Sequence, residues 1–102
     1  MKVQNMESSK SNTIANQFII NDVTIKHLTP NGTECFYTGR MFQSYNSNIA
    51  FIAYNHEVYI DENKWDYSVT TGKYRNKFLG ETKKETQAKI GNGTYILTDL
   101  NN

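Results

Sequence analysis

Residues 18–60 consist of short apolar or alternating runs separated by turn-forming residues, and this pattern constrains the fold most. The runs are rich in Val, Ile, Thr, Tyr and Phe and lie at positions 18–20, 23–28, 33–38, 41–45, 49–54 and 57–60. Such runs are typical of β-strands, and breaks of two or three Asn, Ser or His residues are typical of turns. The pattern predicts an antiparallel meander. The run at 49–54 is apolar on both faces, which favours a central strand.

The strongest turn signal is Thr29-Pro30-Asn31-Gly32. Pro suits the second position of a turn, and Asn-Gly tolerates the backbone angles that follow it. Residues 23–28 and 33–38 are therefore predicted to pair as a hairpin. Asn21-Asp22 interrupts the preceding apolar run and indicates either a tight turn or a bulge.

After residue 61 the spacing of apolar residues changes to that of a helix. Thr70 or Thr71 is a suitable N-cap for a short helix in which Tyr74 and Phe78 share one face. Gly80 suits the position just past the end of that helix, because glycine adopts the left-handed conformation easily.

A second helix is predicted directly after the first. Thr82 and Glu85 match the capping box, in which the hydroxyl and the carboxylate each accept a hydrogen bond from a backbone amide of the first turn. Gly91-Asn92-Gly93 ends this helix, and residues 94–98 predict a final strand.

These patterns together predict the α+β class: an antiparallel sheet of four to six strands with two short C-terminal helices packed on one face. A length of 102 residues suits one domain. Residues 1–15 are polar and aperiodic, so we expect a mobile polar tail there and a single α+β domain over residues 16–102.

Cysteine usage and hydropathy indicate the compartment. The single Cys35 excludes an internal disulfide and a cysteine-based metal site, and its alternating context favours a small buried side chain over a nucleophile. No run approaches the ~20 apolar residues of a membrane span. The first residues lack the apolar segment of a signal peptide. We expect a cytoplasmic protein with no membrane partner.

The sequence offers little for catalysis. His27 and His56 have no further ligands at a zinc-like spacing. Asp61, Glu62 and Asp66 could hold Mg²⁺, but acids elsewhere are sparse and a solvated loop is the commoner outcome. Phosphate-binding glycine loops and nucleophile motifs are absent. We therefore expect no enzymatic activity, no cofactor and no metal.

Charge changes sign along the chain close to the only tryptophan, Trp65. Residues 51–68 carry a net charge of −3, and residues 69–90 carry +4. The first range holds Glu57, Asp61, Glu62 and Asp66 against Lys64. The second holds Lys73, Arg75, Lys77, Lys83, Lys84 and Lys89 against Glu81 and Glu85. A nearly neutral chain thus contains a basic segment interleaved with aromatic residues.

Three interpretations of this segment stay open. As a nucleic-acid interface it would neutralise phosphates with Lys73, Arg75, Lys77, Lys83 and Lys84. As a protein interface it would use aromatic anchors and orienting charges, namely Tyr59, Trp65, Tyr67, Lys73 and Arg75. As ordinary core it would cover one sheet face with Trp65, Tyr67, Tyr74 and Phe78 and leave the lysines solvated.

The string D-Y-S-x-T-T-x-x-Y-R-N-x-F-L-G at residues 66–80 carries a family resemblance, together with Val58-Tyr59-Ile60 before it and Gly93-Thr94-Tyr95-Ile96-Leu97 after it. Over residues 49–100 the chain resembles a group of small uncharacterised proteins of phages and prophages from low-GC Gram-positive bacteria. That group has no function to carry over, so no catalytic residue transfers.

The resemblance implies two kinds of role. Small phage proteins without enzyme motifs are often inhibitors of a host machine or transcription regulators. We expect a phage-encoded binding protein that inhibits a host protein in the host cytoplasm, of the kind that inhibits CRISPR nucleases. The protein could act as a homodimer. The acidic aromatic loop beside a basic helix favours a specific protein contact. The alternative is a small DNA-binding transcription regulator that uses the basic segment 70–90.

Overall fold

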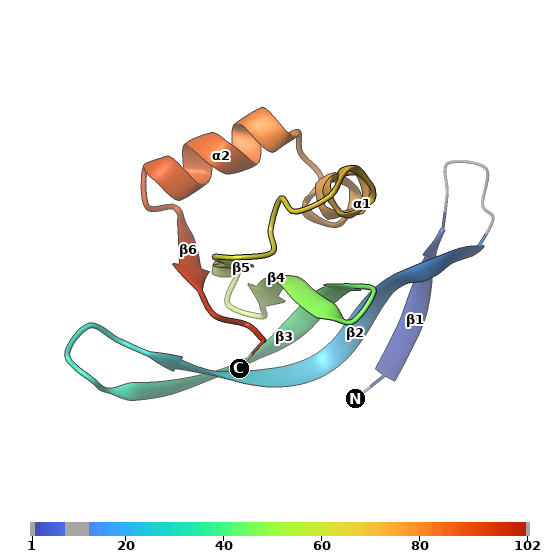
Figure 1. Ribbon diagram of the computed structural model, residues 1–102. Coiled ribbons are helices and arrows are strands. Elements are labelled where there is room, and N and C mark those ends of the chain that lie inside the picture. Colours follow the sequence, from blue (N-terminus) through green and yellow to red (C-terminus); the bar gives the residue numbers. More distant parts are fainter. Residues whose placement is uncertain (1, 8–12, 102) are drawn as a thin grey trace.

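The computed structural model describes residues 2–7 and 13–101 as one six-stranded sheet with two helices on one side (Figure 1). In chain order the elements are β1 (Lys2–Glu7), β2 (Thr13–Leu28), β3 (Glu34–Ser44), β4 (Ser47–Ala53), β5 (Val58–Asp61), α1 (Val69–Leu79), α2 (Lys83–Gly91) and β6 (Tyr95–Thr98). The predicted α+β class is confirmed.

The strands lie in the sheet in their order along the chain. All neighbours are antiparallel except β5 and β6, which are parallel. This departs from the predicted all-antiparallel sheet, and the reason is the connection: α1 and α2 together form the crossover that a parallel neighbour requires. The predicted hairpin is confirmed, with Val23 opposite Gly39 and Leu28 opposite Glu34.

The β2–β3 hairpin bends sharply near its middle. Asp22 has a φ of 58° at a break in register between Ile20 and Val23, so the Asn21-Asp22 interruption is a bulge. Gly39 lies opposite Val23, and its backbone approaches that of Ile52 so closely that a Cβ would overlap the Ile52 carbonyl. The bulge and the glycine together let the outer half of the hairpin curve beneath the other strands (Figure 1).

Alternation along the strands divides the core between the two faces of the sheet. The helix side holds Met6, Phe42, Ile49, Ala50, Ile60, Tyr74, Phe78 and Tyr95, and the other side holds Met41, Phe51, Ala53, Tyr59 and Leu100. Phe42 stacks on Phe78 with ring centroids 5.7 Å apart. The outer half of the hairpin covers the second face through Val23, Ile25 and Tyr37. Bending of the hairpin therefore buries what would otherwise be an exposed sheet face.

Local capping signals place the helix boundaries. Thr82 and Glu85 form the predicted capping box, and Gly80 ends α1 with a φ of 71°. The N-cap of α1 is Ser68, however, and not Thr70 or Thr71. The Thr71 hydroxyl is buried and lies 2.7 Å from that of Ser44 on β3, so it links the helix to the sheet.

The predicted polar tail is wrong for most of its length. Residues 2–7 form the edge strand β1, and residues 13–15 begin β2, while residues 8–12 of the predicted tail lie outside the described residues. Strand pairing uses backbone groups and so needs few apolar side chains. Met6 is buried in the helix-side core, and Ile14 packs against it. These two side chains anchor a segment whose composition alone resembles a tail.

Candidate protein-binding surface

The predicted contact residue Tyr59 lies in the core and not at the surface. It is 1% exposed, and the rings of His27, Tyr37 and Phe51 surround it with centroids 5.2–6.2 Å away. Its hydroxyl donates a hydrogen bond of 2.6 Å to Glu57 Oε2. Burial and this hydrogen bond raise the pKa of Tyr59 well above its ordinary value. Tyr59 is therefore an anchor of the second core.

Arg75 is also buried, at 0% exposed, so it is unavailable to either predicted interface. Its guanidinium donates to the Trp65 carbonyl at 2.5 Å, to Asp66 at 3.3 Å and to the Asn76 amide oxygen at 2.9 Å. These contacts hold the loop before α1 against the helix. Trp65 is half-buried beneath Arg75 and packs against the helix-side core.

Only Tyr67 and Lys73 of the five predicted protein contacts are exposed. Each takes part in a cation–π pair: Lys64 lies 5.3 Å from the centroid of Tyr67, and Lys73 lies 5.5 Å from that of Tyr74. Tyr59 and Arg75 are buried and Trp65 is half-buried, so the five predicted residues do not form one exposed surface.

Several cations of the predicted nucleic-acid interface are already paired. Lys83 forms a salt bridge of 2.7 Å with Asp66, and Lys77 donates a hydrogen bond to the Glu7 carbonyl. Lys83 first, and Arg75 after it, lower the pKa of Asp66 against the opposing effect of burial. Among the described residues, the helices leave Lys73, Lys77 and Lys84 without an acidic partner.

Asp61, in the predicted acidic loop, also makes its contacts within the molecule. Asp61 is buried and accepts hydrogen bonds from the backbone amides of Asn63, Lys64 and Leu100 at 3.2, 2.9 and 2.8 Å. One carboxylate thus shapes the turn after β5 and also holds the segment after β6. Within residues 2–7 and 13–101, no three His, Cys, Asp or Glu residues are grouped to hold a metal ion. Neither helix in this part of the chain is long and apolar enough to cross a membrane.

The outer face of the β2–β3 hairpin carries an apolar surface that sequence reasoning missed. Phe36 is 65% exposed, and its neighbour Leu28 and the side chain of Tyr54 are also exposed. Phe36 lies opposite Lys26, and Leu28 lies opposite Glu34. Tyr54 lies nearer the bulge, because its backbone amide donates to the Thr38 carbonyl and its hydroxyl donates to Asp22. We call Leu28 and Phe36, with the flanking Lys26 and Glu34, the hairpin surface.

A sequence signal for this surface exists. Thr24, Lys26, Thr38 and Arg40 occupy the outward positions of the two strands, and Leu28 and Phe36 fall in the same alternation. In a hairpin with alternating polar and apolar residues, an apolar residue at one of the polar positions faces solvent when the other set of positions is buried. This surface can be identified from the sequence only once it is known which set of positions faces the core.

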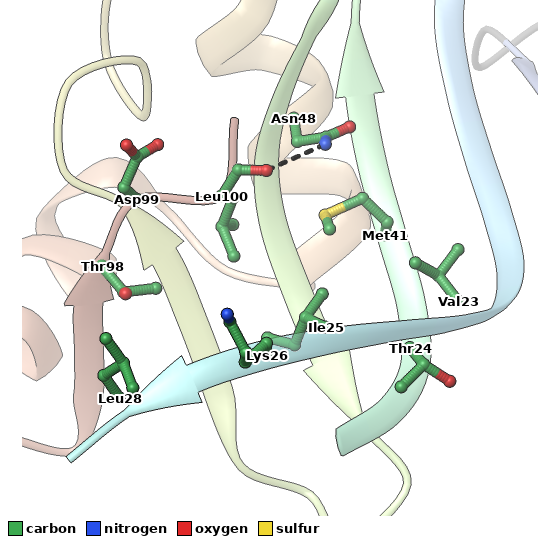
Figure 2. Close-up of a pocket in the computed structure, with 10 residues that line it drawn as sticks. All are labelled: Val23, Thr24, Ile25, Lys26, Leu28, Met41, Asn48, Thr98, Asp99 and Leu100. Carbon is green, nitrogen blue, oxygen red and sulfur yellow. Dashed lines mark hydrogen bonds between the residues drawn. The ribbon is translucent and has the colours of Figure 1, made fainter. Parts of the chain in front are cut away.

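A groove lies beside the outer half of β2 (Figure 2). It has a volume of about 470 Å³ and is walled by β2 on one side and by the segment after β6 on the other. Its lining includes Val23, Ile25, Met41, Thr98 and Leu100, and it shares Lys26 and Leu28 with the hairpin surface. The Asn48 side chain crosses one end, where it donates to the Leu100 carbonyl at 3.0 Å.

Comparison with known proteins assigns the chain to a family without assigning it an activity. No curated protein and no solved structure matches the chain. The model of a family of unknown function, DUF8033, matches residues 1–92. This range includes β1, the whole bent hairpin and both helices, so the match extends over most of the fold. The chain therefore belongs to the family of unknown function DUF8033.

Proposed function

We propose that this protein is a small binding protein that inhibits a host protein, and that it does so through the hairpin surface. The observation that carries the proposal is the exposure of Leu28 and Phe36, which are diagonal neighbours across the two strands of a projecting hairpin. Aromatic and aliphatic side chains flanked by charges of both signs are the usual composition of a protein interface. Burying a phenylalanine that is 65% exposed also provides a favourable apolar contribution to binding.

The use of charge supports a protein partner over nucleic acid. Arg75 and Lys83 bind Asp66, and Lys89 binds Glu81 at 2.7 Å. Half of the six cations in the basic segment are thus engaged with acids of the same molecule. Affinity for nucleic acid depends on many cations that are available to phosphates.

The kind of target is inferred from the resemblance to small phage and prophage proteins over residues 49–100. In that setting a small binding protein without catalytic groups acts by occupying a working surface of a host machine. A defence nuclease, such as a CRISPR effector, is the proposed target, in the host cytoplasm. Binding in this manner needs no cofactor and no catalytic residue.

The test is affinity capture from host extract with the tagged full chain, with and without prior nuclease digestion. We expect one host protein in stoichiometric amount that survives digestion. Phe36→Ser should weaken its binding about tenfold or more. Val69→Ser is the matched control, because Val69 is 91% exposed on α1 and lies outside the hairpin surface. Equal capture by Phe36→Ser and the parent, or recovery of no protein, would overturn the proposal.

A DNA-binding regulator remains the second candidate, because Lys73, Lys77 and Lys84 are exposed on the helices. It requires duplex DNA binding whose log affinity falls with log salt by about 0.9 for each phosphate contact. Changing Lys73 and Lys84 to Gln together should reduce that slope by about 2. Absence of any salt-sensitive shift at micromolar protein removes this candidate.

A further inference from the structure

The outer half of β2 has a free backbone edge. β1 pairs with β2 only as far as Asn21, whereas β2 continues to Leu28. On its other side this half is fully paired with β3. In an antiparallel ladder alternate residues direct their N–H and C=O groups to opposite sides. Residues 22–28 therefore present donors and acceptors along an edge that no strand in the described part of the chain covers.

The groove of about 470 Å³ lies along this same edge. On β2 it is lined by Val23, Thr24, Ile25, Lys26 and Leu28. The residues of β3 that pair with this half, Glu34–Gly39, do not line it. The opposite wall is formed by Thr98, Asp99 and Leu100, and Met41 contributes to the lining between the walls (Figure 2). A free strand edge and a cavity thus coincide at one place.

The dimensions and chemistry of the groove match an extended peptide. Its volume falls in the usual range of ligand sites, about 300–1,000 Å³. The seven residues from Asp22 to Leu28 span roughly 20 Å at about 3.3 Å per residue. The lining alternates apolar Val23 and Ile25 along β2, with polar groups of Thr98 and Asp99 across the gap. An added strand uses its backbone for affinity and alternate side chains for specificity.

We propose that this groove binds an extended segment of a partner protein, which adds as a strand to the free edge of β2 beyond the end of β1. The segment carries apolar side chains at alternate positions, and these contact Val23, Ile25 and Leu100. β1 already uses the same edge of β2 up to Asn21, so the added strand continues an existing mode of pairing around the bend. This inference deepens the proposed protein-binding function and rests on it for the nature of the partner.

The test is selection of a displayed library of random seven-residue peptides on the immobilised full chain. Thr98→Phe fills the groove, and Leu97→Phe is the matched control, because Leu97 is exposed and does not line the groove. We expect selected peptides with alternating apolar residues that bind the parent and Leu97→Phe equally and Thr98→Phe about tenfold more weakly. No selected peptide, or equal binding to Thr98→Phe, would overturn the proposal.

A measurement on the unaltered protein keeps the test valid if Thr98→Phe does not fold. Amide hydrogen exchange should slow within residues 22–28 when a selected peptide is added, and peptides N-methylated at alternate residues should lose this protection. Protection confined to β1 or β6 instead would place the peptide on another edge and contradict the proposal. Capture of a host protein that binds Thr98→Phe as well as the parent would contradict the proposed role of the groove but support the proposed function. Peptides that bind the groove, together with failure to capture any host protein, would support the groove and contradict the proposed function.

Discussion

Arg75 lies over the indole ring of Trp65, with its guanidinium carbon 5.0 Å from the ring centroid. The same guanidinium donates to the Trp65 carbonyl, so one side chain holds both the ring and the backbone of the loop before α1. A cation–π contact of this kind is strongest where water is excluded, and Arg75 is fully buried. Arg75 therefore holds the loop and the helix together from inside the molecule.

Replacement of Arg75 should destabilise the fold. Arg75→Gln removes the donor to the Trp65 carbonyl, while Asp66 keeps its salt bridge to Lys83, and we expect a loss of about 1–3 kcal/mol in the free energy of unfolding. Lys73→Gln, on the exposed side of the same helix, should change it by less than about 0.5 kcal/mol. Chemical denaturation measures both. Parent-like stability of Arg75→Gln would show that the loop does not depend on this contact.

Gly39 should tolerate no side chain. A Cβ there would overlap the Ile52 carbonyl, so Gly39→Ala must push two paired strands apart and should cost about 1–3 kcal/mol. Gly91→Ala is the matched control at the end of α2, where a Cβ meets open space and alanine favours the helix by up to about 1 kcal/mol. Opposite shifts in melting temperature are expected. A neutral Gly39→Ala would contradict the close approach that bends the hairpin.

Met6 should matter although its segment resembles a tail. Its side chain is 4% exposed within the helix-side core, so Met6→Ala should reduce the free energy of unfolding by about 2–5 kcal/mol. Val3→Ala alters an exposed residue of the same strand and should have little effect. Equal melting temperatures for the two variants would restore the tail interpretation of residues 2–7.

Stability should fall in acid partly through Glu81. Its carboxylate accepts hydrogen bonds from Thr86, Lys89 and Tyr95 at 2.5–2.8 Å and so joins the start of α2, its last turn and β6. Burial acts to raise the pKa of Glu81, but these hydrogen bonds, with that from Lys89 the largest, hold it below its ordinary value.

The pKa of Glu81 is lower in the folded state than in the unfolded state. Its contribution to the free energy of unfolding is therefore fully present above the ordinary glutamate pKa of about 4.3, and it is lost as pH falls through the folded-state pKa. Glu81→Gln should therefore be less stable than the parent at pH 7, and the difference should shrink below about pH 4. Denaturation at both pH values measures this. A difference that grows in acid would contradict the assigned role.

Local signals in the sequence determined the turns and helix ends. Thr82 and Glu85 specify a helix start through groups three residues apart, and Gly80 ends α1 through its own backbone freedom. The turn at 29–32 and the alternation on either side likewise specify the hairpin. These interactions are short in sequence, so residue type and spacing suffice to predict them.

Tertiary structure alone decided which side of each strand faces inward and which charges pair. Tyr59 and Phe36 are both aromatic residues in alternating strands, yet Tyr59 is buried and Phe36 is exposed. The reason is the bend at Asp22 and Gly39, which covers one face of the sheet and leaves the outer face of the hairpin in water. Arg75 is buried because Asp66 and the Trp65 carbonyl are folded back onto it. Such outcomes depend on contacts between elements whose packing no local pattern encodes.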